Sequence, residues 1–269
     1  MSGPRPFGLE TCAAAASGRY RVVERRSFGR SALLTLLAPD IAAAARPGQF
    51  VMAAVPGVAF HLRRPLSIHS VHHDRVRLLV EPRGGGTLEL AAAGVADTLA
   101  LAGPLGNGFP LEGVTDGLLV GGGIGVAPLQ FAADALRARG VPVTAAFGFR
   151  RAEQARLAGA IEIADLWVAT DDGSVGRRAT AVELAAEVGA GPRATVLAYG
   201  PAPMLAAVRA WAAAVGLSGF ASLEAHMACG TGACHGCVVA TTEGYLRVCV
   251  EGPVFPFDLL ADAPAEVSA

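Results

Sequence analysis

The stretch GLLVGGGIGVAPL, residues 117–129, is a short apolar run that ends in glycines and leads into a helical pattern over Ala127–Arg139. Gly140 follows at a position where glycine commonly ends a helix. A strand, a glycine loop and a helix in this order predict the first unit of a parallel α/β sheet. The loop lets a phosphate approach backbone N–H groups at the helix N-terminus. Its candidate ligand-binding residues are Gly121, Gly122, Gly123 and Gly125.

The same alternation continues downstream of this unit. The predicted strands are Val143–Phe147, Leu166–Ala169 and Thr195–Tyr199, and the predicted helices are Gln154–Ala160, Ala179–Val188 and Pro203–Val215. We expect a parallel sheet with helices on both faces. The loops after the last two strands then share the ligand-binding edge with the glycine loop, which adds the candidates Thr170, Asp171, Gly200 and Pro201. Because the glycines depart from the G-x-G-x-x-G pattern, a turn without a ligand is the alternative.

Residues 19–112 show a β-rich pattern instead. Short apolar or strand-forming runs alternate with Gly and Pro: Arg19–Arg26, Ala32–Ala38, Gln49–Ala54, Leu66–His69 and Val76–Val80. This spacing predicts a small antiparallel barrel or sandwich. Arg64, beside a proline, suits a diphosphate, and the Ser67 hydroxyl is placed to reach a ring nitrogen. The glycine turn 84–87 opens a predicted helix, Leu88–Ala93, and offers a second phosphate cradle, although each motif alone also fits an ordinary strand end or turn.

Four of the five cysteines lie within 21 residues near the C-terminus: Cys229, Cys234, Cys237 and Cys249. Intervals of four and two residues, followed by a more distant cysteine, match the plant-type iron–sulfur arrangement. A [2Fe–2S] cluster has two tetrahedral irons that each need two thiolates, so a tight loop supplies three ligands and a predicted strand, Leu246–Val250, supplies the fourth. A zinc site or free structural cysteines are the alternatives. Cys12 lies far away and is expected to be a plain small residue.

Composition narrows the class of protein. A chain of 269 residues with 22 basic and 23 acidic side chains lacks the electrostatic footprint of a nucleic-acid-binding protein, and 52% hydrophobic content argues against disorder. The uncharged stretch Gly117–Ala133 has 17 residues with five glycines and a proline, too few apolar residues for a membrane span. With no recognisable secretory signal and an odd number of cysteines, we expect a soluble cytoplasmic chain.

The motifs occur in an order that resembles the ferredoxin–NADP reductase superfamily. The matching segments are 64–67, 84–87, 121–129 and 199–204. Together with the cysteine module and the segment Glu251–Phe255, they resemble the electron-transfer subunits of class 1B dihydroorotate dehydrogenases. The resemblance covers about residues 19–260. Two positions depart from the superfamily pattern: Tyr199 stands where many relatives have cysteine, and Glu81 stands where many have a basic residue.

The resemblance implies an FAD site, a [2Fe–2S] centre and exchangeable NAD. It places Arg64 on the FAD diphosphate and gives Ser67 a catalytic position near flavin N5. The other implied cofactor contacts are Pro65, Leu66, Leu79, Val80 and Glu81 along the flavin, Gly86 and Thr87 on its phosphate, and the loops 121–125 and 170–174 on the pyridine dinucleotide. The four clustered cysteines hold the iron–sulfur centre.

The implied function is electron transfer within a larger enzyme of pyrimidine (UMP) biosynthesis. Electrons leave dihydroorotate through FMN in a separate catalytic subunit, cross the cluster singly, collect on FAD and depart to NAD⁺ as hydride. This chain does not act on dihydroorotate by itself in that scheme, and two copies of each subunit form a heterotetramer. The alternatives are a flavin and iron–sulfur subunit of a sulfhydrogenase or NADH–ferredoxin oxidoreductase, and a non-enzymatic iron–sulfur scaffold or redox sensor.

The expected architecture is a multi-domain α+β chain. Its expected parts are an N-terminal segment (1–18), an FAD-binding antiparallel β-barrel (19–112), an NAD-binding α/β domain (113–217) and a [2Fe–2S] module (218–269). Only 17% of the residues are charged. We interpret this low charge as a sign of surface that is permanently buried against the partner subunit, because obligate interfaces are more apolar than free surface.

Overall fold

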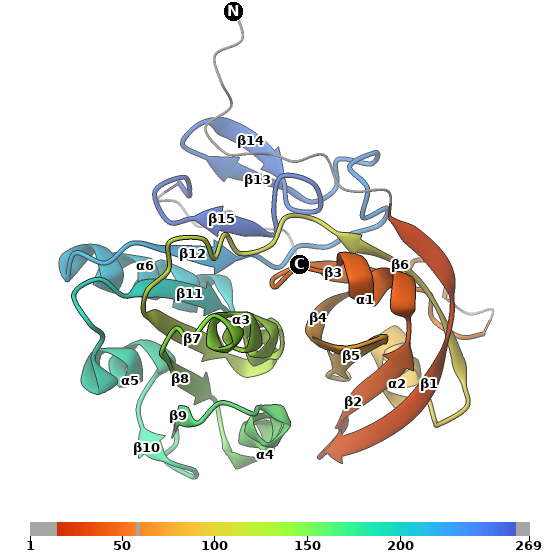
Figure 1. Ribbon diagram of the computed structural model, residues 1–269, viewed down its shortest axis with the longest axis horizontal. Helices are drawn as coiled ribbons and strands as arrows, with labels where there is room; N and C mark the ends of the chain where they lie inside the picture. The colour runs from red at the N-terminus through yellow and green to blue at the C-terminus, as the bar shows by residue number, and fades with distance from the viewer. Residues whose placement is uncertain (1–14, 58–59, 262–269) are drawn as a thin grey trace, which may run out of the picture.

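The computed structural model describes residues 15–57 and 60–261, which form a barrel, an α/β layer and a smaller C-terminal module (Figure 1). The barrel is closed by six strands in the order β1-β2-β5-β4-β3-β6. Its elements are β1 (Ala16–Phe28), β2 (Ser31–Leu37), α1 (Pro39–Ala44), β3 (Phe50–Ala53), β4 (Arg64–His72), β5 (Arg75–Val80), α2 (Gly85–Ala92) and β6 (Thr98–Leu105). The predicted antiparallel barrel is confirmed, whereas Cys12 lies outside the described residues.

The barrel strand β2 shows why its sequence is apolar almost without interruption. Side chains alternate between the two faces of a strand. Leu34 and Leu36 fill the barrel core, while Leu33 packs in the core shared with the α/β layer. Both faces of β2 are therefore buried, and a strictly alternating polar pattern is absent because this strand has no solvent-exposed face along most of its length.

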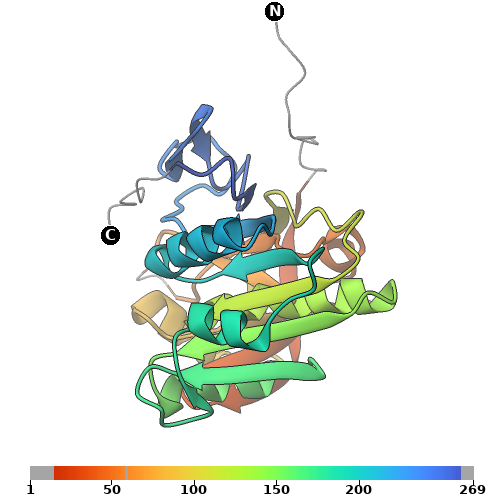
Figure 2. The same cartoon turned by 90° about the vertical axis from the view of Figure 1, so that its left-hand side faces the viewer.

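The second sheet has the strand order β10-β9-β8-β7-β11-β12-β15. Its elements are β7 (Gly117–Gly122), η1 (Gly123–Val126), α3 (Ala127–Ala138), β8 (Val143–Phe149), α4 (Ala152–Ala155), η2 (Arg156–Ala160), β9 (Asp165–Thr170), β10 (Arg177–Arg178), α5 (Ala181–Val188), β11 (Thr195–Tyr199), α6 (Ala202–Ala214), β12 (Gly219–Ser222) and β15 (Val254–Pro256). Helix α3 lies between this sheet and barrel strand β4, and α5 and α6 cover the opposite face (Figure 2). The strand order reverses between β7 and β11, the kind of switch point where open α/β sheets bind ligands.

Barrel strand β6 has no predicted counterpart, and three further details differ from the expectation. The segment after residue 217 contributes two strands to the second sheet: β12 pairs in parallel with β11, and β15 pairs antiparallel with β12. The predicted strand Leu246–Val250 is wrong, because β14 (Gly244–Arg247), the partner of β13 (Val238–Thr241), ends before Cys249. The N–H groups of Val250 and Glu251 both donate to the Arg247 carbonyl and bend the chain into a turn.

The third difference concerns the segment after β8. A single helix is expected over Gln154–Ala160, but the chain forms the short helix α4 and then the 3₁₀ turn η2. Within the described ranges, no helix is long and apolar enough to cross a membrane.

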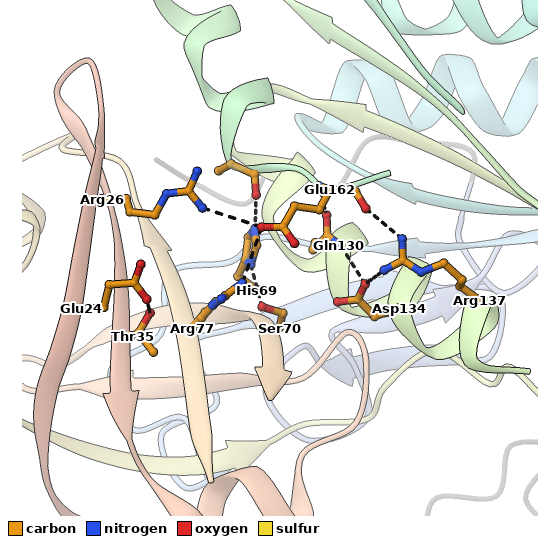
Figure 3. A network of polar contacts seen from close by, with 11 residues as sticks. Glu24, Arg26, Thr35, His69, Ser70, Arg77, Gln130, Asp134, Arg137 and Glu162 are labelled. Carbon is orange, nitrogen blue, oxygen red and sulfur yellow. Dashed lines mark hydrogen bonds and ion pairs between the residues drawn. The ribbon is translucent and has the colours of Figure 1, made fainter. Parts of the chain in front are cut away.

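The barrel and the α/β layer meet through a polar network (Figure 3). His69 on β4 is 1% exposed, and its Nε2 lies 3.1 Å from the carbonyl oxygen of Ala160 at the end of η2. Next to this contact, Arg26 of β1 and Arg77 of β5 point at the Glu162 carboxylate over 3.7 and 3.8 Å. Both barrel strands thus reach the same short segment of the α/β layer.

Burial keeps the His69 imidazole neutral. Desolvation lowers its pKa to about 3; the hydrogen bond to the Ala160 carbonyl opposes this shift, and the positive charge of Arg77 adds to it. On the other side of the boundary, the Gln130 side chain of α3 accepts the Glu162 N–H at 2.6 Å. The network therefore joins β4 to the end of η2 and joins the segment after η2 to α3, through neutral hydrogen bonds.

Candidate redox site

The four clustered cysteines form two pairs of different exposure. Cys229 is half-buried and Cys234 is exposed; their sulfurs lie 3.3 Å apart, and the N–H groups of Thr231 and Cys234 donate to Cys229 Sγ at 3.4 and 3.5 Å. Cys237 and Cys249 are buried, and the Cys249 N–H donates to Cys237 Sγ at 3.4 Å. The fold therefore brings the predicted ligands together as two pairs.

This arrangement fits a [2Fe–2S] cluster better than a single zinc ion. Each iron of the cluster takes two thiolates, whereas a structural zinc ion gathers four ligands around one point. Among the residues that the structure describes, no three His, Cys, Asp or Glu side chains are grouped closely enough to hold one metal ion. A dinuclear centre, with one thiol pair for each iron, satisfies this geometry.

The electrostatic settings of the two pairs differ as well. Partial burial acts to raise the pKa of Cys229, but the N–H donors of Thr231 and Cys234 outweigh it and lower that pKa to about 6. Desolvation and the neighbouring Cys237 raise the pKa of Cys249 to about 12. A bound metal deprotonates a coordinating thiol, so Cys249 needs the metal centre to form a thiolate, while Cys229 is already close to that state.

Arg64 and the turn that opens α2 lie against each other. A Cβ atom added at Gly86 would lie 2.9 Å from Arg64 Nε, so only glycine lets the helix start this close to the guanidinium. Arg64 is held by a 2.7 Å hydrogen bond to the Leu62 carbonyl and lies over the Phe60 ring. A guanidinium beside a helix N-terminus is a suitable cradle for a diphosphate. The two barrel motifs singled out in the sequence thus form one surface that fits FAD.

The other predicted barrel contacts have different surroundings. Thr87 Oγ1 accepts the N–H groups of Arg83 and Gly84 at 2.8 and 3.1 Å, so this hydroxyl shapes the turn. Leu79 and Val80 are buried in apolar cores, and Glu81 is paired with Arg83 at 2.9 Å. The acidic Glu81, which departs from the superfamily pattern, is therefore neutralised within its own turn. The contacts of these residues with a flavin stay predictions.

Ser67 joins the barrel to the α/β layer. Its Oγ lies 3.2 Å from the hydroxyl of Tyr199, the residue that ends β11 at the switch point. Desolvation raises the pKa of Tyr199 above its ordinary value, and the negative charge of Glu224 raises it further. The phenol therefore stays protonated and can donate to Ser67. The tyrosine that replaces the usual cysteine thus holds the hydroxyl expected beside the flavin ring.

Glu224 completes this edge of the site, and the sequence gives no sign of it. Desolvation raises the pKa of Glu224, Arg83 opposes this shift, and Glu81 adds to it. Arg83 and Glu81 come from the barrel turn, whereas Glu224 follows β12 about 140 residues later. No local pattern marks a carboxylate whose neighbours come from such distant segments.

The loops predicted to face a dinucleotide begin side by side. Gly121 at the end of β7 is paired in register with Tyr199 of β11, so the 121–125 loop and the Gly200–Pro201 turn leave the sheet next to each other. Thr170 is fully buried, and its hydroxyl donates to the Val175 carbonyl at 2.9 Å. It shapes the 170–174 loop from inside, whereas Asp171 is exposed at the sheet edge. Binding of NAD to these loops stays a prediction.

Comparison with known proteins covers nearly the whole chain. A family model described as the iron–sulfur cluster binding domain of dihydroorotate dehydrogenase B matches residues 224–261, which include all four clustered cysteines. The chain is 39% identical over 253 residues to the dihydroorotate dehydrogenase B (NAD(+)) electron transfer subunit of Bacillus caldolyticus, covering 88% of this chain and 96% of that protein. It is 36% identical over 214 residues to the subunit of the same name from Caldanaerobacter subterraneus subsp. tengcongensis, with 78% and 84% covered.

A solved structure shows the same architecture. A chain in the structure of an NADH-dependent reduced ferredoxin–NADP oxidoreductase, a protein studied for flavin-based electron bifurcation, matches with a TM-score of 0.78 at 27% identity. The match covers 92% of this chain and 91% of that chain. The barrel, the α/β layer and the C-terminal module therefore occur together, in the same arrangement, in a second protein.

Proposed function

The chain belongs to the family of dihydroorotate dehydrogenase B electron transfer subunits, and from this membership we propose that it carries electrons from dihydroorotate oxidation to NAD⁺. The partner in this proposal is an FMN-containing catalytic subunit, and two copies of each chain form the complete enzyme. Oxidation of dihydroorotate to orotate releases two electrons and two protons, and NAD⁺ takes up both electrons with one proton as hydride. The chain thereby serves pyrimidine biosynthesis.

The observation that carries the proposal is the arrangement of the thiols as one outer and one buried pair. The outer pair, Cys229 and Cys234, reaches the surface where a partner's electron can enter. The buried pair, Cys237 and Cys249, lies in an apolar core that also contains barrel residues. A cluster held by both pairs therefore connects the protein surface to the barrel that carries the FAD motifs.

In this proposal the barrel motifs and the 121–125 loop hold FAD and NAD. Arg64 and the N-terminus of α2 bind the FAD diphosphate, and Ser67, held by Tyr199, presents its hydroxyl at the flavin edge next to the 121–125 loop. FAD supplies the conversion between one-electron and two-electron transfer that neither the cluster nor NAD performs alone. Four free thiols suit a reducing compartment, and we place the complex in the cytoplasm.

The test is an anaerobic dihydroorotate:NAD⁺ assay on the chain co-purified with its catalytic subunit. Cys249→Ser removes a buried cluster ligand, so iron content and NAD⁺ reduction are expected to fall to background. Cys12→Ser is the matched control and keeps both at the level of the unaltered protein. Iron and flavin analysis accompany each measurement.

Two outcomes oppose the proposal. If the Cys249→Ser complex loses its iron and still reduces NAD⁺ at the original rate, the thiol pairs are not on the electron route. If the unaltered complex oxidises no dihydroorotate but links NADH to ferredoxin reduction, the chain serves a different oxidoreductase.

A further inference from the structure

Barrel strand β3 lies between the two redox motifs of the chain. On one side it pairs antiparallel with β4, with Phe50 opposite Ser67 and Met52 opposite Pro65. The guanidinium of Arg63, which directly precedes the flavin motif 64–67, also donates to the Met52 carbonyl at 3.2 Å. The backbone of β3 is therefore hydrogen-bonded to the segment that is expected to line the flavin.

The side chains Phe50 and Met52 of β3 pack against the cysteine module. Phe50 and Met52 are 3% and 1% exposed and share one apolar core with the buried ligands Cys237 and Cys249. Leu105 of the neighbouring strand β6 completes the barrel's part of that core. The module is thus seated on the barrel through apolar side chains of β3 and β6.

Gly230 shows how close the cysteine loop comes to Met52. This residue follows Cys229 and has a φ of +71°, a conformation that favours glycine. A Cβ atom added at Gly230 would lie 2.5 Å from Met52 Cγ and 3.0 Å from its Sδ. The loop backbone therefore lies directly on the methionine side chain, with no room for another group.

We propose that Met52 is the positioning residue that sets the separation between the cluster loop and the flavin strand. The inference rests on the proposed function and deepens it, because it names the contact that couples the two redox groups. Electron tunnelling falls steeply with distance and is slower across a water-filled gap than through packed protein. A long, polarisable thioether fills an irregular gap of this kind without strain and keeps water out.

The step that this contact serves is an electron transfer in which no protein bond forms or breaks. With both groups bound, one electron would pass from the reduced cluster, which is thereby oxidised, to the flavin, which is thereby reduced. Two such transfers and one proton from solvent would supply the electron pair and proton that leave to NAD⁺ as hydride. Met52 itself is neither oxidised nor reduced.

The test compares Met52→Ala with Met52→Leu and with Leu99→Ala. Leu99 is 1% exposed in the barrel core but does not belong to the core shared with the cysteines, so its truncation controls for a general loss of barrel packing. Anaerobic stopped-flow mixing with NADH separates reduction of the flavin from bleaching of the cluster. In Met52→Ala we expect the cluster phase to slow by about tenfold, a size that small misplacements of reacting groups cause, with the flavin phase, iron and FAD contents unchanged.

Met52→Leu preserves most of the volume and is expected to restore the cluster phase, while Leu99→Ala keeps the original ratio of the two phases. Hydrogen–deuterium exchange of residues 229–237 in the cofactor-free chain gives a second readout: exchange rises in Met52→Ala and not in Leu99→Ala. If Met52→Ala fails to fold, Met52→Val gives the graded comparison.

The results that overturn the inference are specific. An unchanged cluster phase in Met52→Ala, or an equal slowing in Leu99→Ala, shows that Met52 does not set the separation. The proposed function fails instead if NADH reduces neither the flavin nor the cluster of the unaltered chain.

Discussion

The barrel has two boundaries of different character. Towards the α/β layer it adds a polar network around His69 and Glu162 to an apolar core that includes Leu33, while towards the cysteine module it presents the apolar side chains Phe50 and Met52. Hydrogen bonds are directional, so the first boundary defines an orientation between the flavin strand and the dinucleotide loops. Apolar contacts exclude water, so the second defines a dry, close separation. In the proposed function, the boundary with the polar network is where hydride moves, and the dry apolar boundary is where single electrons move.

The two boundaries also differ in what holds them. Burial of apolar side chains contributes about 1.5–3 kcal/mol for each large residue. Ion pairs between exposed groups contribute about 0–1 kcal/mol and weaken with salt. The apolar contacts are therefore expected to dominate stability at both boundaries, and the polar network is expected to respond to pH and ionic strength.

The largest expected effect comes from truncating the apolar boundary. Phe255 of β15 is 1% exposed and packs in the core that contains Met52 and the buried cysteines. Phe255→Ala is expected to lower the free energy of unfolding by about 3–5 kcal/mol, because it removes buried surface and leaves a cavity. Tyr245, 80% exposed in the same module, is the matched aromatic control.

Urea unfolding of the two variants measures this difference. Tyr245→Ala is expected to change the free energy of unfolding by less than about 0.5 kcal/mol. Equal losses in both variants would show that the apolar core does not hold the module in place.

The next effect is the response of the polar boundary to acid. Folded His69 has a pKa of about 3, and the unfolded residue has its ordinary value of 6.5. Between these values the unfolded chain binds the extra proton, so stability is full above pH 6.5 and falls as the pH drops towards 3. The positive charges of Arg77, His72 and Arg26 add to the cost of protonating the folded residue. About 2–3 kcal/mol is expected to be lost between pH 6.5 and pH 4.5.

His69→Gln isolates this contribution. Its neutral amide can still donate to the Ala160 carbonyl and does not titrate. The contributions of all other titratable groups to the pH dependence are the same in the two proteins and cancel in the difference. We expect the free energy of unfolding of the variant to fall less steeply over this pH interval. Identical slopes in the two proteins would mean that His69 titrates normally in the folded state.

The sequence predicts the elements whose signals are local. Apolar runs with Gly and Pro between them mark five of the six barrel strands, and the strand–glycine loop–helix order marks the start of the α/β layer at residue 117. It does not predict β12 and β15 within one sheet, because the Ala221–Phe255 pairing joins residues far apart in the chain. It also wrongly places Cys249 in a strand. The mostly apolar segment 246–250 is typical of a strand, but hydrogen bonds to the Arg247 carbonyl bend it into a turn.

The candidate site divides in the same way. Spacing alone singles out the four cysteines, and the structure brings them together as pairs. The Ser67–Tyr199 hydrogen bond joins two modules and has no local signature. His69 lies two residues after Ser67, yet only the position of η2 shows that it is buried. The sequence pattern therefore predicts the residues of each local motif but not the tertiary contacts between modules.

The smallest expected effect tests whether ion pairs add to the polar boundary. Glu162 is 56% exposed, and its carboxylate lies 3.7 and 3.8 Å from Arg26 and Arg77. Glu162→Gln removes the charge and leaves the backbone hydrogen bonds of this residue in place. We expect a loss of about 0–1 kcal/mol at low salt that disappears at high salt, because exposed pairs are screened. Glu187→Gln, which breaks the pair with Arg177 inside the α/β layer, is the matched control.

Urea unfolding at two ionic strengths distinguishes the possibilities. A similarly small, salt-sensitive loss in both variants means that Glu162 is an ordinary surface charge, and the orientation of the barrel then depends on the buried hydrogen bond of His69. A loss of several kcal/mol in Glu162→Gln alone, unchanged by salt, would contradict the comparison. In that case the polar boundary would contribute as much to stability as the apolar one, and orientation and separation would no longer be held by different kinds of contact.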